Sequence, residues 1–105
     1  MKVKELLNYK GKWTKGEYVR DKNGNKCLVL SKEAVKWCLV GAISKCYFPK
    51  RASVNGVNLK HVNKAYDKIK KVLKECTLYD TLEEFNDNKK TTFGTVKKVL
   101  ELANV

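Results

Sequence analysis

Apolar residues recur at helical spacing through the second half of the chain. Between residues 59 and 76 they stand three or four positions apart, which predicts a helix with one stripe facing the core. The members of this stripe are Leu59, Val62, Tyr66, Ile69, Leu73 and Cys76. Five lysines fall on the opposite side of the predicted helix: Lys60, Lys64, Lys68, Lys71 and Lys74.

Threonine positions predict where two further helices start. Thr81 is placed to cap a short helix that runs through Phe85, because its hydroxyl can accept a hydrogen bond from the first free amides. After a turn over residues 86–90, Thr91 or Thr92 is expected to cap a last helix. The apolar positions of that helix are Phe93, Val96, Val99, Leu100 and Ala103.

The stretch from residue 32 to residue 47 is apolar on nearly every side. With Ser31 as a suitable N-cap, the pattern predicts a helix over 32–47 that packs against several neighbours at the centre of the fold. Gly41 lowers helix propensity, which predicts a second backbone passing close to it. Pro49 ends this helix and begins a loop over residues 49–56.

Turn chemistry predicts a β-hairpin near the N-terminus. Residues 18–20 and 27–30 are the expected strands, and Asn23-Gly24 supplies the two positive φ angles that a type I′ turn requires. Residues 3–7 predict a short helix before it. The expected class is therefore α+β, with a short N-terminal helix, one β-hairpin, then three or four packed helices. At 105 residues the chain is expected to form a single domain, 1–105.

Charge separates the two halves of the chain. The sequence holds 23 Lys and Arg against 11 Asp and Glu, for a net charge of +12. Residues 1–60 carry fourteen basic and four acidic side chains, whereas residues 61–105 carry nine and seven. Such a surplus favours polyanionic partners, such as nucleic acid or an acidic nucleoprotein. The alternative is a lysine-rich solvated surface that serves solubility.

The cysteines and the single histidine do not have the spacing of a metal site. Cys27, Cys38, Cys46 and Cys76 lack the C-x-x-C pairs that zinc ligands commonly form, so neither a metal nor a cofactor is expected. No signal sequence or membrane span is visible, which favours a cytoplasmic location with reduced thiols. The apolar helical surroundings of all but Cys27 predict buried thiols.

Catalysis is the weaker class of function for these residues. Cys38 lies within two turns of a predicted helix start, and His61 is the only imidazole that could serve as its base. The neighbours Trp37 and Leu39 nevertheless favour a packed core thiol. His61 is expected at the surface or its boundary.

The N-terminal region has the composition of a nucleic-acid interface. Basic side chains there can bind phosphates, while the rings of Tyr9, Trp13 and Tyr18 can stack on bases. The candidate polyanion-binding residues are Lys10, Lys12, Lys15, Arg20, Lys22, Lys26, Lys50 and Arg51. In the alternative, Trp13 and Tyr18 are core residues that cover the inner face of the hairpin. The sequence has no helix-turn-helix spacing and no RNP motif, so little sequence specificity is expected.

Three stretches resemble the signatures of one protein family. Residues 13–24, WTKGEYVRDKNG, resemble a W-T-x-G-x-x-A-R-D-x-x-G pattern, and residues 37–42, WCLVGA, resemble W-C-x-x-G-A. Residues 85–87, FND, followed by Thr92 and Val96, resemble a W-N-D…T-x-x-x-V ending. The family consists of small uncharacterised proteins of bacteria and their phages, so the resemblance implies a fold and an origin but no mechanism. The departures are Val19, Phe85 and a basic insertion around Lys50.

The polar residues of these motifs have two interpretations. Arg20 and Asp21 are expected to form an ion pair that fixes the hairpin, while Asn86 and Asp87 cap a helix or bond the hairpin backbone. Alternatively, all four converge with Trp37 on a cleft for a small ligand or substrate.

The leading hypothesis is a small non-catalytic binding protein, borne by a phage or mobile element, that engages nucleic acid or a nucleoprotein complex. An anti-CRISPR inhibitor of host defence is one concrete form of it. No membrane partner is expected, and the oligomeric state is left open.

Overall fold

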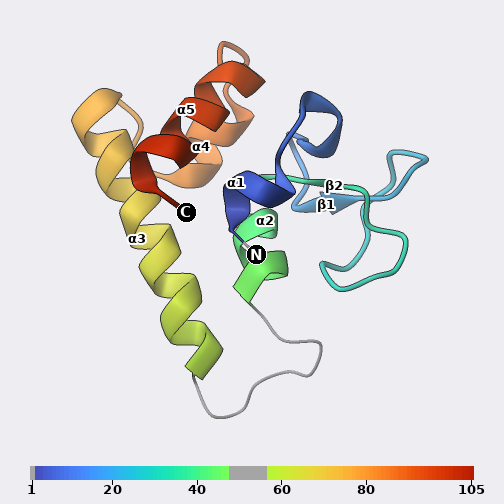
Figure 1. The fold of residues 1–105 in the computed structure, drawn as a ribbon. Helices are drawn as coiled ribbons and strands as arrows, with labels where there is room; N and C mark the ends of the chain where they lie inside the picture. Colours follow the sequence, from blue (N-terminus) through green and yellow to red (C-terminus); the bar gives the residue numbers. More distant parts are fainter. Residues whose placement is uncertain (1, 48–56) are drawn as a thin grey trace.

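Helices form most of the structure, a computed structural model that describes residues 2–47 and 57–105 (Figure 1). Helix α1 spans Val3–Leu6 and is followed by a short 3₁₀ helix, η1, at Lys10–Lys12. Two short strands come next, β1 at Val19–Arg20 and β2 at Lys36–Trp37. The chain continues through α2 (Leu39–Tyr47), α3 (Val57–Cys76), α4 (Leu82–Asp87) and α5 (Phe93–Ala103). This confirms the predicted α+β class with a strand pair and packed helices.

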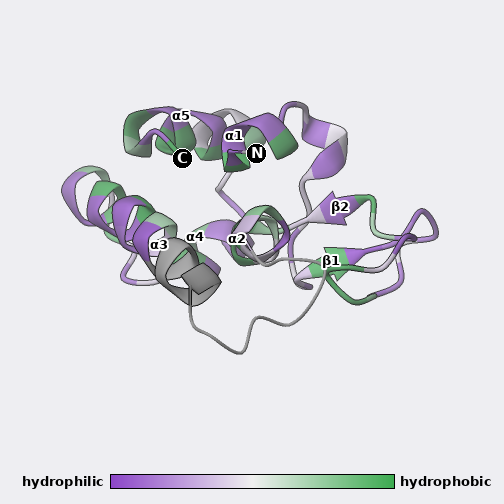
Figure 2. Cartoon of the chain, turned by 60° about the horizontal axis from the view of Figure 1, so that its bottom comes forward, coloured by the Kyte–Doolittle hydropathy of each residue, from purple (hydrophilic) through white to green (hydrophobic). Residues whose placement is uncertain are grey.

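Helix α2 lies at the centre of the fold, as predicted. It contacts α1, α3, α4 and β2, and its residues Leu39, Ala42 and Ile43 are fully buried. Helices α1 and α5 lie in one layer over α2, α3 and α4, while the two strands extend from one end (Figure 2). The shared core comprises Val3, Leu6, Leu7, Val19, Trp37, Leu39, Ala42, Ile43, Ala65, Ile69, Leu73, Leu82, Phe85, Val96, Val99, Leu100, Ala103 and Val105.

The predicted helix starts at Thr81 and Thr92 are confirmed. Oγ1 of Thr81 accepts a hydrogen bond from the backbone N of Glu84 at 3.1 Å. Oγ1 of Thr92 accepts one from the backbone N of Thr95 at 3.3 Å. The long helix α3 is confirmed as well, and the exposed lysines along its described side chains are Lys64, Lys68, Lys71 and Lys74. The side chain of Lys60 lies outside the described residues.

Strand β1 does not pair mainly with residues 27–30, which corrects the predicted hairpin. Its antiparallel partner is β2, with Val19 opposite Trp37. On its other edge β1 forms an isolated bridge from Arg20 to Lys26, and beyond residue 27 the chain turns away, leaving Leu28 81 % exposed. Pairing with β2 buries the Trp37 ring, a larger gain in apolar burial than the exposed stretch after residue 27 could provide.

The turn at residues 21–25 forms, but it is not of type I′. Gly24 has a φ of +84°, whereas Asn23 is not among the residues with positive φ. The carboxylate of Asp21 accepts hydrogen bonds from the backbone N of Asn23 at 2.9 Å and of Asn25 at 3.0 Å. The Asp21 side chain fixes this turn through the two amides, so a positive φ is needed only at Gly24.

The predicted helix over 32–47 is wrong in its first half. Lys36 is exposed and Trp37 is buried, which is the two-residue alternation of a strand. Oγ of Ser31 accepts a hydrogen bond from the backbone N of Glu33 at 3.1 Å, yet the residues after it form turns rather than a helix. The apolar positions before residue 39 belong to β2 and its flanks.

The close backbone approach expected at Gly41 is confirmed. A Cβ at Gly41 would overlap the carbonyl oxygen of Tyr18. The same oxygen accepts a hydrogen bond from the backbone N of Cys38 at 3.0 Å. The first turn of α2 therefore rests directly on the backbone that leads into β1, which requires a glycine there.

The cysteines are buried to different degrees. Cys38 is buried, Cys27 and Cys46 are partly buried, and Cys76 is exposed, so the prediction of a buried thiol is wrong for Cys76. Cys76 is the last residue of α3, and Leu73 is the last member of the predicted stripe that is buried. Burial raises the pKa of Cys46 to about 11.

Candidate functional site

A buried asparagine, Asn86, joins three parts of the chain through hydrogen bonds. Its Oδ1 accepts from Nε1 of Trp13 at 2.7 Å and from the backbone N of Leu39 at 3.1 Å. Its Nδ2 donates to the carbonyl oxygen of Thr14 at 3.0 Å and to Oδ1 of Asp87 at 2.9 Å. The side-chain amide therefore makes all four hydrogen bonds available to it, in a residue that is only 1 % exposed.

The folding of the neighbouring segments explains why these groups meet. Asn86 lies on the buried side of α4, next to Phe85. The N-terminal segment reaches it because the backbone N of Thr14 donates to the carbonyl oxygen of Trp37 at 3.1 Å. The amide of Leu39 is at the start of α2 and lacks a partner within that helix, so Asn86 satisfies a donor that would otherwise be orphaned.

Asp87 fixes the next residues of the N-terminal segment. Its Oδ1 accepts a hydrogen bond from the backbone N of Gly16 at 3.0 Å. Gly16 has a φ of +84°, a conformation that glycine adopts without strain. These contacts agree with the interpretation of Asn86 and Asp87 as structural residues that bond the backbone near the strands.

Arg20 and Asp21 do not form the expected ion pair. Arg20 donates from Nε to Oγ1 of Thr14 at 2.9 Å, from Nη1 to the carbonyl oxygen of Gly24 at 2.7 Å, and from Nη2 to that of Lys15 at 3.0 Å. Asp21 accepts from its own turn amides instead. The guanidinium is thus engaged in holding two loops together, which favours a structural role over phosphate binding.

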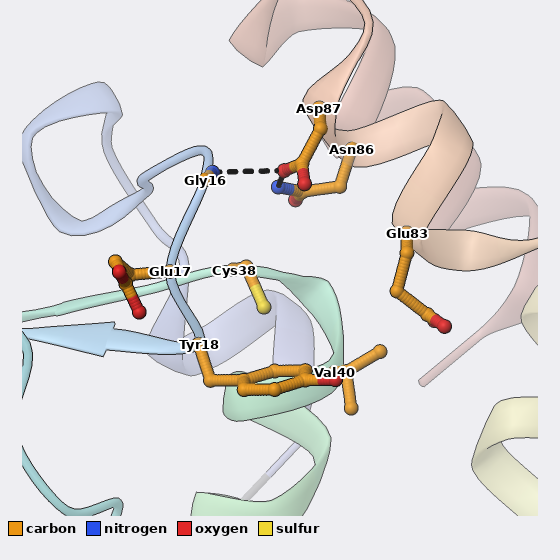
Figure 3. Close-up of a pocket in the computed structure, with 8 residues that line it drawn as sticks. All are labelled: Gly16, Glu17, Tyr18, Cys38, Val40, Glu83, Asn86 and Asp87. Carbon is orange, nitrogen blue, oxygen red and sulfur yellow. Dashed lines mark hydrogen bonds between the residues drawn. The ribbon is translucent and has the colours of Figure 1, made fainter.

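A cleft of about 190 Å³ opens beside Asn86 and Asp87 (Figure 3). The close-up shows both side chains pointing from α4 toward the loop at Gly16, with the ring of Tyr18 beside Val40. The lining residues are Gly16, Glu17, Tyr18, Cys38, Val40, Glu83, Asn86 and Asp87. Arg20, Asp21 and Trp37, the other members of the expected polar cleft, are not part of this lining.

Trp37 is buried away from the cleft. Its side chain is 6 % exposed, and within the described part of the chain its Nε1 has no hydrogen-bond partner. Trp37 contacts the residues around Asn86 through its backbone, because its carbonyl oxygen accepts a hydrogen bond from the backbone N of Thr14.

Cys38 contributes a sulfur to the cleft, but not as an activated nucleophile. Burial raises the pKa of the Cys38 thiol, and the carboxylates of Asp87 and Glu83 raise it further. The backbone N of Gly41, which donates to Sγ at 3.3 Å, acts in the opposite direction and is outweighed. A neutral thiol is a poor nucleophile. The side chain of His61, the expected base, lies outside the described residues.

A second groove, of about 560 Å³, lies between the N-terminal segment and the start of α5. Its lining consists of Lys10, Trp13, Lys15, Thr91, Thr92, Phe93 and Gly94, and we call it the Trp13 groove. The ring centroids of Trp13 and Phe93 are 6.2 Å apart, with the planes tilted by 44°. Nζ of Lys15 lies 5.3 Å from the centroid of the Trp13 ring and donates to the carbonyl oxygen of Asn88 at 2.6 Å.

A family model matches residues 2–104, nearly the whole chain. Its description is a family of unknown function, DUF6197. The chain belongs to this family. No curated protein and no solved structure matches it. Because DUF6197 brings no activity with it, the groove and the cleft are the basis for a functional proposal.

The start of α5 makes the Trp13 groove of this DUF6197 chain favourable for anions. The amides of Phe93 and Gly94 are among the first four of the helix, which have no partner within it, and the helix dipole is positive at this end. The exposed Lys89 and Lys90 come just before the capping residue Thr92. Ammonium groups, free amides and aromatic rings therefore meet at one place.

Of the other basic residues singled out in the sequence, Lys12, Lys22 and Lys26 lie in η1 or close to β1. Element η1 contacts β2, and both lie away from α3 (Figure 1). Nζ of Lys12 lies 5.5 Å from the centroid of the Tyr9 ring. Lys22 is exposed in the turn after β1, and Lys26 lines a separate groove with Tyr18. Lys50 and Arg51 lie outside the described residues.

The aromatic residues of this region differ in exposure. Trp13 is partly buried and packs against the core, as the core interpretation expects. Tyr9 and Tyr18 are 57 % and 56 % exposed, so neither covers an inner face of the strands.

The α5 side of the Trp13 groove escapes prediction from the sequence. Helical spacing alone places Phe93 in the core stripe of the last helix, whereas the structure leaves it partly exposed beside Trp13. One local signal was available: an aromatic residue directly after a capping threonine, preceded by two lysines. Such a residue lies in the first turn of a helix, where anions bind.

In the described residues, no helix is both long and apolar enough to cross a membrane.

Proposed function

We propose that this protein is a small non-catalytic binding protein that engages single-stranded nucleic acid, free or within a nucleoprotein complex, through the Trp13 groove. The observation that supports it is the lining of this groove, which contains two aromatic rings and two lysines but no carboxylate among its described residues. Rings of this kind stack on bases, and ammonium and amide groups bind phosphates. DNA and RNA both present these groups.

Trp13 and Phe93 supply the stacking surface in this proposal. The hydrogen bond from Nε1 of Trp13 to Asn86 holds the indole ring in place before the ligand arrives, which lowers the entropic cost of binding. Stacking on an aromatic side chain is worth about 1–3 kcal/mol per base and accepts any base. Binding with little sequence specificity follows.

Lys10 and Lys15 supply the phosphate contacts at the groove, with Lys12, Lys89 and Lys90 nearby. The net charge of +12 attracts a polyanion over a longer range and raises the association rate. Arg20 acts indirectly, because its hydrogen bond to the carbonyl oxygen of Lys15 fixes the loop that presents this lysine.

The salt dependence of binding tests the phosphate contacts. Fluorescence anisotropy of a labelled single-stranded oligonucleotide should show log K falling with log salt concentration by about 0.7 for each phosphate contact. Lys10→Gln is expected to reduce this slope by about 0.7. Lys71→Gln removes the same charge from an exposed position on α3 and should leave the slope unchanged. Equal effects of the two variants, or absence of binding at low salt, would contradict the proposal.

The stacking contribution is tested by Phe93→Leu. Loss of one stacking surface is expected to lower the affinity for the oligonucleotide about tenfold, with an unchanged salt slope. The melting temperature of the variant serves as the control for folding. An unchanged affinity in a folded Phe93→Leu variant would exclude Phe93 from the interface.

The biological setting is part of the same proposal. Small size and high positive charge suit a protein of a phage or mobile element that acts on a nucleoprotein of its host, and an anti-CRISPR protein that occupies a nucleic-acid-bound effector is one concrete form. Affinity capture from host lysate, with and without nuclease, tests it. Capture of one complex that survives nuclease would indicate a protein contact, and capture that is lost with nuclease would indicate nucleic acid.

The cleft beside Asp87 supports a second candidate function, the binding of a small cationic ligand. Its lining includes the carboxylates of Glu17, Glu83 and Asp87. However, the side chain of Asn86 has no hydrogen-bonding capacity left for a ligand. The Trp13 groove is therefore the preferred site.

A further inference from the structure

A cavity of about 290 Å³ lies where the two ends of the described chain meet, away from the Trp13 groove. The two ends meet beside α1, where the backbone N of Lys4 donates a hydrogen bond to the carbonyl oxygen of Val105 at 3.0 Å (Figures 1 and 2). The lining residues are Lys2, Tyr47, Lys64, Ala65, Lys68, Asn104 and Val105. The cavity is far larger than the roughly 10–15 Å³ that a single water requires.

Two lysine side chains share one neutral acceptor at this cavity. Nζ of Lys2 and Nζ of Lys4 each donate to Oδ1 of Asn104 at 3.1 Å. The two ammonium groups therefore cannot be farther apart than twice that distance, and they repel each other. An amide oxygen carries no net charge, so it orients the two cations without neutralising them.

Helix α3 adds two more ammonium groups to the same cavity. Lys64 and Lys68 are four residues apart, so they lie on one face of the helix, and both are exposed. Like charges at this spacing destabilise a helix slightly unless an opposite charge lies between them. The buried Ala65 is small and leaves space beside them.

Tyr47 provides a neutral hydrogen-bond donor at the edge of the cavity. Burial raises the pKa of its hydroxyl, with a smaller contribution from the carboxylate of Glu5. The hydroxyl thus keeps its proton at neutral pH and can donate to an anion. Glu5 is the neighbouring acidic group, and its Oε1 accepts from the backbone N of Lys2 at 3.2 Å.

A purely structural role explains only half of this arrangement. Asn104 is the C-cap of α5, with a φ of 55°, and cations are stabilising near the C-terminus of a helix. That effect accounts for Lys2 and Lys4. It does not account for Lys64 and Lys68, which reach the same cavity from α3.

We propose that this cavity is a second anion site, which binds a phosphoryl group through the amino groups of Lys2, Lys64 and Lys68 in its lining and of Lys4 beside Asn104. The phosphoryl group belongs to a free phosphate compound or to a nucleic-acid backbone, since both present the same oxygens. The site is separate from the Trp13 groove and does not depend on the function proposed for it.

Titrations with inorganic triphosphate and with a single-stranded oligonucleotide, followed by NMR at constant ionic strength, test this site. Shifts are expected at the resonances of Tyr47, Lys64, Lys68 and Asn104. The double variant Lys64→Gln/Lys68→Gln should weaken triphosphate binding at least about tenfold, because hydrogen bonds to charged groups of this kind are lost. Lys70→Gln/Lys74→Gln is the matched control, with the same charge loss at the same spacing on the same helix.

The outcomes separate the two sources of phosphate and the two sites. Shifts at the cavity with triphosphate support a free phosphate compound, and shifts with the oligonucleotide alone support a backbone phosphate. Equal weakening by the two double variants, or shifts spread over lysines throughout the molecule, would overturn the proposal. Lys10→Gln should leave triphosphate binding at the cavity intact. The proposals for the Trp13 groove and for this cavity can therefore be contradicted independently of each other.

Discussion

The N-terminal segment, residues 8–37, and the helical part of the molecule are held together by different forces. The helices share a core of fully buried side chains such as Leu39, Ile69 and Leu100. Within residues 8–37 only Val19 and Trp37 are buried. The same segment leaves several large apolar side chains exposed, namely Tyr9, Tyr18, Leu28, Leu30 and Val35.

Polar side chains take the place of a core in the N-terminal segment. Arg20 and Asp21 bond the backbone within it, while Asn86 and Asp87 bond its backbone from α4. Each such contact needs one particular residue, whereas apolar burial accepts many. This difference explains why the distinctive polar motifs of the sequence converge here, and why the segment has side chains free to contact a partner.

The largest expected effect comes from Asn86→Ala. The substitution leaves the partly buried Nε1 of Trp13 and the buried backbone N of Leu39 without their acceptor, and each unsatisfied donor costs about 1–3 kcal/mol. We expect the free energy of unfolding to fall by about 2–5 kcal/mol, measured by urea denaturation. Asn8→Ala, at an exposed asparagine, is the control and should change little.

Hydrogen exchange sharpens this prediction into a comparison of the two regions. Asn86→Ala should speed exchange first at the amides of residues 13–16, through local opening. Leu73→Ala, which removes a buried side chain between the helices, should cost about 2–5 kcal/mol and speed exchange in the core of the helical part. Identical exchange patterns in the two variants would show that the regions unfold as one unit.

Gly41→Ala is expected to have the next largest effect, because it changes the contact between the two regions. The added Cβ would overlap the carbonyl oxygen of Tyr18, so α2 and the backbone before β1 must move apart. Overpacking of this kind costs about 1–3 kcal/mol. Ala42, the next residue, shows that the helix itself accepts alanine. An unchanged melting temperature for Gly41→Ala would mean that this contact can relax freely.

The helices could be predicted from the sequence because their signals are local. The apolar stripe of α3 and the capping hydroxyls of Thr81 and Thr92 lie within the elements that they determine. The strand pairing was predicted less well, because two short stretches compete for β1 and the choice depends on where Trp37 is buried. The pairing with β1 also holds the backbone of residues 36–37 in an extended conformation, so α2 begins at Leu39 rather than at the predicted residue 32.

The candidate sites could be predicted only in part, for a related reason. The lysines and Trp13 of the groove stand close together in the sequence, but Phe93 joins them only through the packing of α5. The cavity at Asn104 combines residues from both ends of the chain and from α3. The polar motif residues were recognisable, yet their partners were not, since Arg20 and Asp21 each bond backbone groups rather than each other.

Asp87→Ala is expected to have a smaller effect than the preceding substitutions. Asp87 is exposed, and its loss removes one hydrogen bond to Gly16 and one to Asn86, which together contribute about 1–2 kcal/mol. A structural role thus predicts a measurable decrease in melting temperature, with nucleic-acid binding retained in the folded variant. Loss of binding at an unchanged melting temperature would instead favour the cleft as the ligand site.

The smallest expected effect is a dependence of the free energy of unfolding on pH, which arises from a buried thiol in the helical part. In the unfolded chain the thiol of Cys46 has a pKa near 9.0, and burial raises the pKa to about 11 in the folded protein. Between these values the unfolded state loses the proton while the folded state keeps it, so the free energy of unfolding decreases as pH rises from 9 to 11. Cys46→Ala should flatten this decline, and Cys76→Ala, which removes an exposed thiol, is the matched control. An equal decline in both variants would place the alkaline sensitivity outside α2 and weaken the view that burial is what holds the helical part together.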